Sequence, residues 1–163
     1  MNAALELDAL PREELRALVR ELAARPDEWL HLVQHSRDQR HYELLLHDQR
    51  VMVWLISWMD DHDTGFHDHD VSSGAVAVVE GRVREDRLRL GAEPTTRVLE
   101  AGEVFDFGAS DIHRVAHEPG GPAITIHAYS PPLWRMGAYV VEPSGTLRRE
   151  SLSYAEELRP LAA

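Results

Sequence analysis

The stretch Thr64-Gly65-Phe66-His67-Asp68-His69 leads into the β-branched run Val71-Ser72-Ser73-Gly74-Ala75-Val76-Ala77-Val78-Val79-Glu80-Gly81. One residue separates the two histidines, and the valine-rich run behind them is typical of a strand. Successive side chains of a strand point to opposite faces, so His67 and His69 point the same way. Their two imidazoles are therefore placed to bind one metal ion.

A second histidine-bearing stretch lies downstream: Gly102-Glu103-Val104-Phe105-Asp106-Phe107-Gly108-Ala109-Ser110-Asp111-Ile112-His113. It provides a third histidine, and His117 follows on the same expected strand and on the same face. Both His113 and His117 are candidates for a third ligand. The acidic residues around the first stretch also fit a solvated loop, but the two stretches together favour a shared site.

The composition narrows the class of protein. The chain has 163 residues, with 17 Lys and Arg against 28 Asp and Glu, and a net charge of −11. This balance disfavours nucleic acid and anionic membranes as partners, because phosphates are held mainly by Lys and Arg. Cysteine is absent from the sequence, which excludes disulfides, thiolate ligands and a cysteine nucleophile. The chain start lacks a signal-peptide pattern, and no apolar run approaches the ~20 residues of a membrane helix, so we expect a cytoplasmic protein.

The hydrophobic pattern predicts one domain over residues 1–163, with a helical segment at about 9–36 and a barrel at about 41–152. Two helices are expected in the first segment, because apolar residues recur at helical spacing and a proline opens each helix. The second segment consists of short β-like runs separated by turn residues. Such a pattern indicates a sandwich or a barrel.

Local patterns add finer expectations. The alternation of charged and apolar residues over 82–90 predicts a half-exposed strand. Residues 91–95 are expected to form a loop, and 154–158 to form a short helix capped by Ser153. His62 belongs to an acidic loop, and we expect it to be solvated.

The two histidine stretches resemble the paired motifs of the cupin superfamily. His67 and His69 occupy the histidine places of the first motif, and Gly74 replaces the acidic ligand of that motif. Gly102 and His113 match the spacing of the second motif, which favours His113 over its neighbour as the third ligand. The resemblance implies a mainly β fold, the cupin double-stranded β-helix (jelly-roll) barrel with N-terminal α-helices.

Within cupins, residues of about 40–142 are similar to the cysteine dioxygenase (thiol dioxygenase) family. The segments that carry the similarity are F-H-D-H (66–69), I-H-R-V (112–115) and I-H-A-Y-S-P-P (126–132). This resemblance implies an Fe(II) site of three histidines with no carboxylate, held by His67, His69 and His113. Three neutral imidazoles suit Fe(II) and leave one face of the metal open. Without a carboxylate the ion keeps its double charge, which favours an anionic thiolate.

The same resemblance implies catalytic roles for Thr125, His127 and Tyr129. Strand alternation places all three side chains on one face. Tyr129 would donate a hydrogen bond to oxygen or to the substrate, His127 would orient the phenol, and Thr125 would fix His127. A buried pair that only satisfies its own hydrogen bonds is the alternative for His127 and Tyr129.

The family also places an arginine two residues beyond a tyrosine on the first strand, where it binds the substrate carboxylate. Counting from Tyr42, that place holds Leu44, which cannot replace a guanidinium. Three arginines lie nearby in the sequence, Arg40, Arg50 and Arg135. We assign substrate binding to Arg135, which follows the proline-rich end of a strand, together with Tyr129.

The resemblance thus implies a mononuclear non-haem iron thiol dioxygenase. It would oxidise a small thiol, cysteine or a related mercapto acid, to its sulfinic acid with O2. The expected partners are the thiol and O2, with no nucleic acid and no membrane, and the expected assembly is a monomer or homodimer. Two alternatives stay open: a metal-binding cupin that binds a small metabolite without oxidising it, and a cupin dioxygenase or isomerase acting on a non-thiol substrate.

Overall fold

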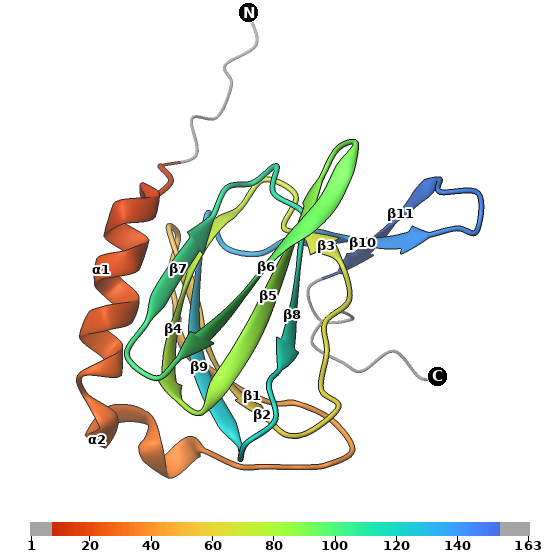
Figure 1. The fold of residues 1–163 in the computed structure, drawn as a ribbon. Helices are drawn as coiled ribbons and strands as arrows, with labels where there is room; N and C mark the ends of the chain where they lie inside the picture. Colours follow the sequence, from red (N-terminus) through yellow and green to blue (C-terminus); the bar gives the residue numbers. More distant parts are fainter. Residues whose placement is uncertain (1–7, 154–163) are drawn as a thin grey trace, which may run out of the picture.

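The computed structural model describes residues 8–153 (Figure 1). The helix expected at 154–158 therefore lies outside the described residues. Helix α1 (Arg12–Ala23) is amphipathic, and Leu15 and Val19 are buried where it packs on the sheet. This pattern places α1 on the outer surface of the barrel.

The second expected helix is shorter than the sequence predicts. It consists of α2 (Pro26–Trp29), a single turn, followed by the 3-10 helix η1 (Leu30–Leu32). Its buried side chain, Trp29, donates from indole Nε1 to the carbonyl of Leu22 at 2.8 Å. This one anchor supports only a short helix, and the chain becomes extended at Val33. None of the helices within residues 8–153 is long and apolar enough to cross a membrane.

Eleven strands follow in the described part of the chain: β1 (His41–His47), β2 (Met52–Trp58), β3 (His67–Asp68), β4 (Ser73–Glu80), β5 (Arg82–Arg89), β6 (Ala92–Glu100), β7 (Val104–Phe107), β8 (His113–His117), β9 (Ala123–Ser130), β10 (Arg135–Val141) and β11 (Leu147–Ser153). The loop expected at 91–95 is instead mostly strand, as part of β6. The chain reverses in a tight turn at Leu90 and Gly91, where the glycine takes a φ of 68°. This turn is short enough for the next strand to begin at once.

The strands form two antiparallel sheets that face each other (Figure 1). The five-stranded sheet has the order β1-β2-β9-β4-β7, and the six-stranded sheet has the order β11-β10-β3-β8-β5-β6. Helix α1 packs on the outside of the first sheet, against β4, β7 and β9. The arrangement is a jelly-roll barrel, which confirms the mainly β fold with N-terminal helix.

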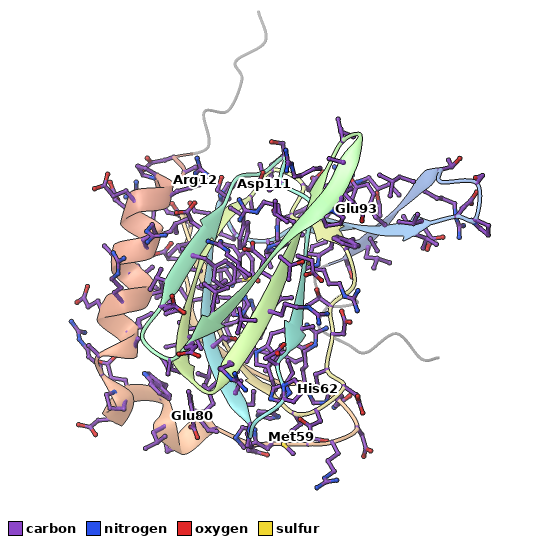
Figure 2. All side chains as sticks on the ribbon, in the orientation of Figure 1. Arg12, Met59, His62, Glu80, Glu93 and Asp111 are labelled. Carbon is purple, nitrogen blue, oxygen red and sulfur yellow. The ribbon has the colours of Figure 1, made fainter. Side chains whose placement is uncertain are left out.

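Strand β9 separates the two cores of the molecule. Ile124, Ile126 and Ala128 belong to the core beneath α1, whereas Tyr129 belongs to the core between the sheets. Figure 2 shows side chains filling the space between the sheets. Because alternate residues of a strand face opposite sides, the polar residues of β9 point into the barrel.

Candidate metal centre

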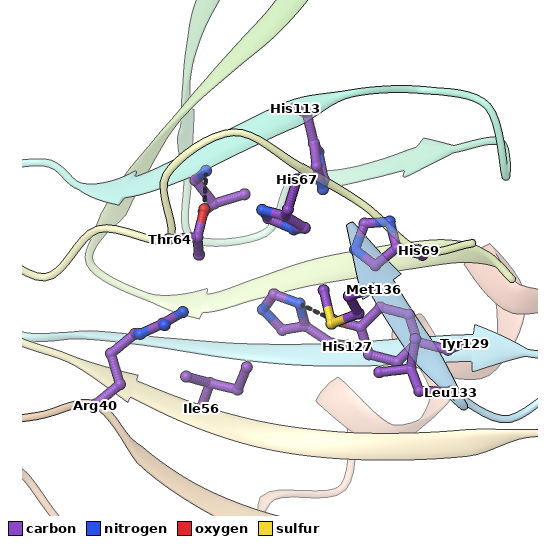
Figure 3. A pocket seen from close by; sticks show the side chains of 11 residues that line it. Arg40, Ile56, Thr64, His67, His69, His113, His127, Tyr129, Leu133 and Met136 are labelled. Atoms are coloured by element: carbon purple, nitrogen blue, oxygen red, sulfur yellow. Dashed lines mark hydrogen bonds between the residues drawn. The ribbon is translucent and has the colours of Figure 1, made fainter. Parts of the chain in front are cut away.

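Three histidines meet inside the barrel (Figure 3). His67 on β3 lies directly opposite His113 on β8 in the register of the two strands. His69 follows β3 at the next position on the same face. Their candidate ligand atoms all lie within 4.8 Å of one another, and all three residues are buried. The structure therefore brings together the three residues that the sequence singled out.

Hydrogen bonds at Nδ1 orient two of the three imidazole rings. His67 Nδ1 lies 2.9 Å from the carbonyl oxygen of Gly65, and His113 Nδ1 lies 3.0 Å from the carboxylate of Glu85. Both acceptors call for a proton on Nδ1, which leaves Nε2 as the metal-binding nitrogen. His69 Nδ1 is buried and has no hydrogen-bond partner among the described residues.

Burial keeps two of the three histidines, His69 and His113, neutral. It lowers the pKa of His69 and of His113 well below the ordinary 6.5, and the neighbouring His67 adds to the effect. Neutral imidazole is the form that binds a metal. No aspartate or glutamate among residues 8–153 joins the three histidines. Such a donor set fits a divalent transition metal and leaves coordination positions for other ligands.

Strand β4 approaches the cluster through a glycine. A Cβ at Gly74 would overlap the ring of Phe107, its cross-strand partner on β7. That ring stacks on His69, with centroids 4.3 Å apart and planes 21° from parallel. An aromatic ring, and not an acidic side chain, therefore fills the space beside the histidines.

A chain of hydrogen bonds, here called the relay, runs along the inner face of β9. Trp58 Nε1 donates to Thr125 Oγ1 at 2.8 Å, and Thr125 Oγ1 lies 2.7 Å from His127 Nε2. His127 Nδ1 in turn lies 3.1 Å from the hydroxyl of Tyr129. Because an indole only donates, we assign the hydroxyl proton of Thr125 to the bond with His127. Burial, with Arg40 nearby, lowers the pKa of His127 to about 3, so the relay contains a neutral imidazole.

The three histidines of the cluster line one pocket together with His127 and Tyr129 of the relay (Figure 3). The open cavity within it is small, about 20 Å³, which is the room of roughly one water molecule. One cation, Arg40, points into the pocket from the side opposite Tyr129. The remaining wall residues are mostly apolar: Ile56, Thr64, Val115, Leu133 and Met136.

Arg40 supplies the positive charge of this pocket, and the structure does not bring Arg135 there. Arg40 precedes β1 and is buried. Arg135 is largely exposed, and its Nη2 lies 3.4 Å from Asp70. The next residue on β10, Met136, lines the pocket. Strand alternation therefore turns Arg135 to the outside.

Sequence spacing does not predict three contributors to the site, Arg40, Trp58 and Glu85. Glu85 lies on a strand expected to be half-exposed, yet its side chain is 1% exposed. The sequence does contain a pattern that predicts this burial, because Glu85 lies two residues from the apolar Val83 and therefore on the same face of the strand. Arg40 has a signal too, since it shares a strand face with Leu44, the place of the family's arginine. We find no sequence pattern that marks Trp58.

His117 and His62 both lie outside the metal site. Four residues along a strand place His117 about 13 Å beyond the cluster, and its Nε2 lies 2.7 Å from the carbonyl of Gly121. The expectation that His62 is solvated is wrong, because the loop folds over the barrel end and buries it (Figure 2). His62 Nδ1 accepts from the backbone N–H of Met59 at 2.9 Å, and burial lowers its pKa.

Asp68, between the two histidines of the first stretch, has the opposite orientation. Burial opposes its ionisation, but hydrogen bonds from Arg149 and Tyr139 outweigh burial and lower the pKa of Asp68. An ionised carboxylate therefore lies behind the candidate ligands, away from the pocket.

Two antiparallel sheets around a buried three-histidine cluster define a cupin with a candidate metal centre. The family profile described as cysteine dioxygenase type I matches residues 3–141, which is most of the chain. The protein belongs to this family. A search of curated proteins gives no significant match.

Solved structures share the barrel at low sequence identity. A conserved protein with a double-stranded β-helix domain from Klebsiella pneumoniae has a TM-score of 0.54 and 13% identity, over 73% of this chain and 90% of its own. A cupin superfamily protein from Desulfitobacterium hafniense has a TM-score of 0.54 and 16% identity, over 63% and 87%. The protein TT1209 from Thermus thermophilus has a TM-score of 0.54 and 20% identity, over 63% and 93%. At these identities the likeness concerns the fold alone, and it confirms the cupin double-stranded β-helix.

Proposed function

We propose that this protein is a mononuclear non-haem iron dioxygenase that oxidises a small thiol carrying an acid group to its sulfinic acid. Dioxygen alone balances the reaction: R–SH and O2 give R–SO2H, with both oxygen atoms bonded to sulfur. Membership of the cysteine dioxygenase type I family supports the proposal. The observation that carries it is the hydrogen-bonded run from Thr125 through His127 to Tyr129, whose last two members share one pocket with three buried histidines.

The chain's own residues divide the work between binding and orientation. His67, His69 and His113 would hold the iron through their ring nitrogens. When bound, Fe(II) supplies open positions for a thiolate and for dioxygen, and its double charge favours the ionised thiol. His127 holds Tyr129, so that the phenol donates a hydrogen bond toward the negative charge that develops on the reacting atoms.

We assign recognition of the substrate's acid group to Arg40, in place of Arg135. A guanidinium presents a planar fork of N–H donors that matches a carboxylate. The rings of Trp58 and Tyr42 lie 5.2 and 5.5 Å from the guanidinium carbon of Arg40, and they orient it in the pocket wall. A mercapto acid bound in this pocket would place its acid group at Arg40 and its sulfur toward the histidines.

The direct test measures O2 consumption by the Fe(II)-loaded protein with 3-mercaptopropionate, L-cysteine and cysteamine. The first two thiols carry a carboxylate, whereas cysteamine carries only an amine. We expect uptake with a carboxylated thiol, and mass spectrometry after reaction under isotopically labelled O2 should find both labelled atoms in the sulfinate. Fully iron-loaded protein that consumes no O2 with any thiol would overturn the proposal. That result would favour a cupin that binds a metabolite without oxidising it, or one that acts on a non-thiol substrate.

The substitution Arg40→Met tests which arginine binds the carboxylate of the substrate. We expect the KM for the carboxylated thiol to rise about 10- to 100-fold, the usual loss for a charge-assisted hydrogen bond. Arg135→Met is the matched control and should keep the wild-type KM. The reverse pattern, with KM raised only in Arg135→Met, would return the assignment to Arg135.

A further inference from the structure

Asp68, the residue between the two histidines of the first stretch, connects the candidate metal centre to the C-terminal hairpin of β10 and β11. Its side chain points away from the pocket, opposite to those of His67 and His69, and is 9% exposed. Five hydrogen bonds from other parts of the chain reach its two oxygens. The donors are Asp70 N, Gly137 N, Tyr139 Oη, Arg149 Nε and Arg149 Nη2.

Arg149 makes the strongest of these contacts. Its Nε lies 2.9 Å from Oδ2 of Asp68, and its Nη2 lies 3.0 Å from Oδ1. A two-pronged pair of guanidinium and carboxylate fixes orientation as well as distance. The hydroxyl of Tyr139 adds a bond of 2.6 Å to Oδ2. Both oxygens of the carboxylate are therefore held by the hairpin.

The strand that carries Arg149 is joined to the metal centre by few backbone contacts. Within the described residues, β11 pairs with β10 alone, and it lies beyond the family match at residues 3–141. Strand β10 pairs with β3 at two positions, Gly137 with Asp68 and Ala138 with His67. Strand β3 has two residues and pairs also with β8, through His67 and His113, so the side-chain bonds to Asp68 add to a small number of backbone contacts.

The sequence of the hairpin leaves room for this contact. The guanidinium of Arg149 crosses β10 above Gly137, where a methyl group would overlap it. The neighbouring Arg148 pairs instead with Glu142 and Glu150 at the surface. The two adjacent arginines therefore differ in their partners, and only Arg149 reaches toward the histidines.

We propose that Arg149 is a positioning residue of the metal centre, acting through Asp68 to fix the segment that carries His67 and His69. The inference rests on the proposed metal binding by the three histidines, and it is independent of thiol oxidation. Without the guanidinium, Asp68 loses its main anchor and the two histidines are held less firmly. Loss of groups that orient metal ligands costs about 10- to 100-fold in metal affinity.

The test measures Co(II) affinity of the full-length protein by competition with a chelator, at a temperature where circular dichroism shows each variant folded. Arg149→Met removes the guanidinium, Arg149→Lys keeps the charge without the fork, and Gly137→Ala displaces the guanidinium from Asp68. We expect the Kd to rise about 10-fold in Arg149→Met and in Gly137→Ala, and by less in Arg149→Lys. Arg148→Met is the matched control on the same strand and should keep the wild-type Kd.

A purely structural role gives a different result. It would lower the melting temperature while the folded Arg149→Met protein kept the wild-type Kd and visible Co(II) spectrum, and this outcome would overturn the proposal. If Arg149→Met does not fold, the Co(II) Kd and visible spectrum of Gly137→Ala and Arg149→Lys distinguish the two roles in the same way. If the wild-type protein binds no Co(II), both the proposed metal centre and this inference are wrong. If the wild-type protein binds Co(II) and the variants bind it with the same affinity, only the positioning role of Arg149 is wrong.

Discussion

Tyr129 is the last member of the relay that starts at Trp58 and passes through Thr125 and His127. Tyr129→Phe removes the phenolic donor and leaves the three histidines unchanged. We expect kcat for thiol-dependent O2 uptake to fall about 100-fold, the usual effect of losing one preorganised donor to developing negative charge. Iron content should stay at the wild-type level, and metal analysis of the assayed sample checks this. An unchanged kcat would contradict the role assigned to Tyr129.

Glu85 is a buried carboxylate shared by three partners. It lies 3.0 Å from His113 Nδ1, and donors of Arg87 and Arg97 approach its oxygens to 2.8 and 2.7 Å. A carboxylate on the far nitrogen of a histidine fixes the tautomer and makes the imidazole a stronger ligand. Glu85→Gln should therefore weaken metal binding by about 10- to 100-fold in a chelator competition.

Asp86→Asn is the matched control for Glu85→Gln. Asp86 follows on the same strand and points to the opposite face, where it accepts a hydrogen bond from Thr96 at 2.7 Å. Its replacement should leave metal affinity unchanged. If Glu85→Gln binds metal as tightly as the wild type, the carboxylate behind His113 has no part in ligation.

Among the elements, the pairing of β4 with β7 determines what lies beside the histidines. Gly74 and Phe107 are direct partners, and the Phe107 ring covers Gly74 and stacks on His69. Gly74→Ala inserts a methyl group into filled space, which should lower the free energy of unfolding by about 1–3 kcal/mol. Urea unfolding at constant pH measures this loss.

Phe107→Leu provides the room that the added methyl group needs. The loss caused by Gly74→Ala should therefore be smaller in a Phe107→Leu background, with a coupling of about 0.5–3 kcal/mol in a double-mutant cycle. Additive effects of the two substitutions would show that the ring is not what excludes a side chain at Gly74. The same packing accounts for the absence of an acidic ligand at this position.

Strand patterns predicted most of the barrel, because alternation and turn chemistry are local properties of the sequence. The strand at 96–99 was expected, and the exceptions are the beginning of β6 at 92–95 and the burial of Glu85, which both depend on neighbouring strands. Residues 92–95 belong to a strand because β5 offers them a partner after a tight turn at Leu90 and Gly91. Glu85 is buried because β6 and β8 flank β5 and bring Arg97 and His113 to it. Neither partner is visible in the spacing of one segment.

Over the whole molecule, the part of the site that lies within single strands could be predicted from the sequence. The part that forms only when the barrel closes could not. Spacing along β3, β8 and β9 predicted which histidines and which hydroxyl groups share a face. Arg40 was one of three candidate arginines but was not chosen, because Arg135 follows the proline-rich end of a strand whereas Arg40 only precedes β1. Pairing of β2 with both β1 and β9 brings Arg40 beside the relay. That neighbourhood exists only in the closed fold.

The metal-free protein should become less stable as the pH is lowered, because His127 is buried as a neutral imidazole. Burial, with Arg40 nearby, lowers its pKa to about 3, against roughly 6.5 in an unfolded chain. Below about pH 6.5 the unfolded state binds the additional proton, so the free energy of unfolding falls by about 1.4 kcal/mol per pH unit; burial of His69 and His113 acts in the same direction. His127→Gln should reduce this slope by about 1.4 kcal/mol per pH unit in urea unfolding between about pH 6 and about pH 4 with a chelator present. His47→Gln, at the exposed surface, is the control, and a slope for His127→Gln equal to that of the wild type would contradict the neutral buried state.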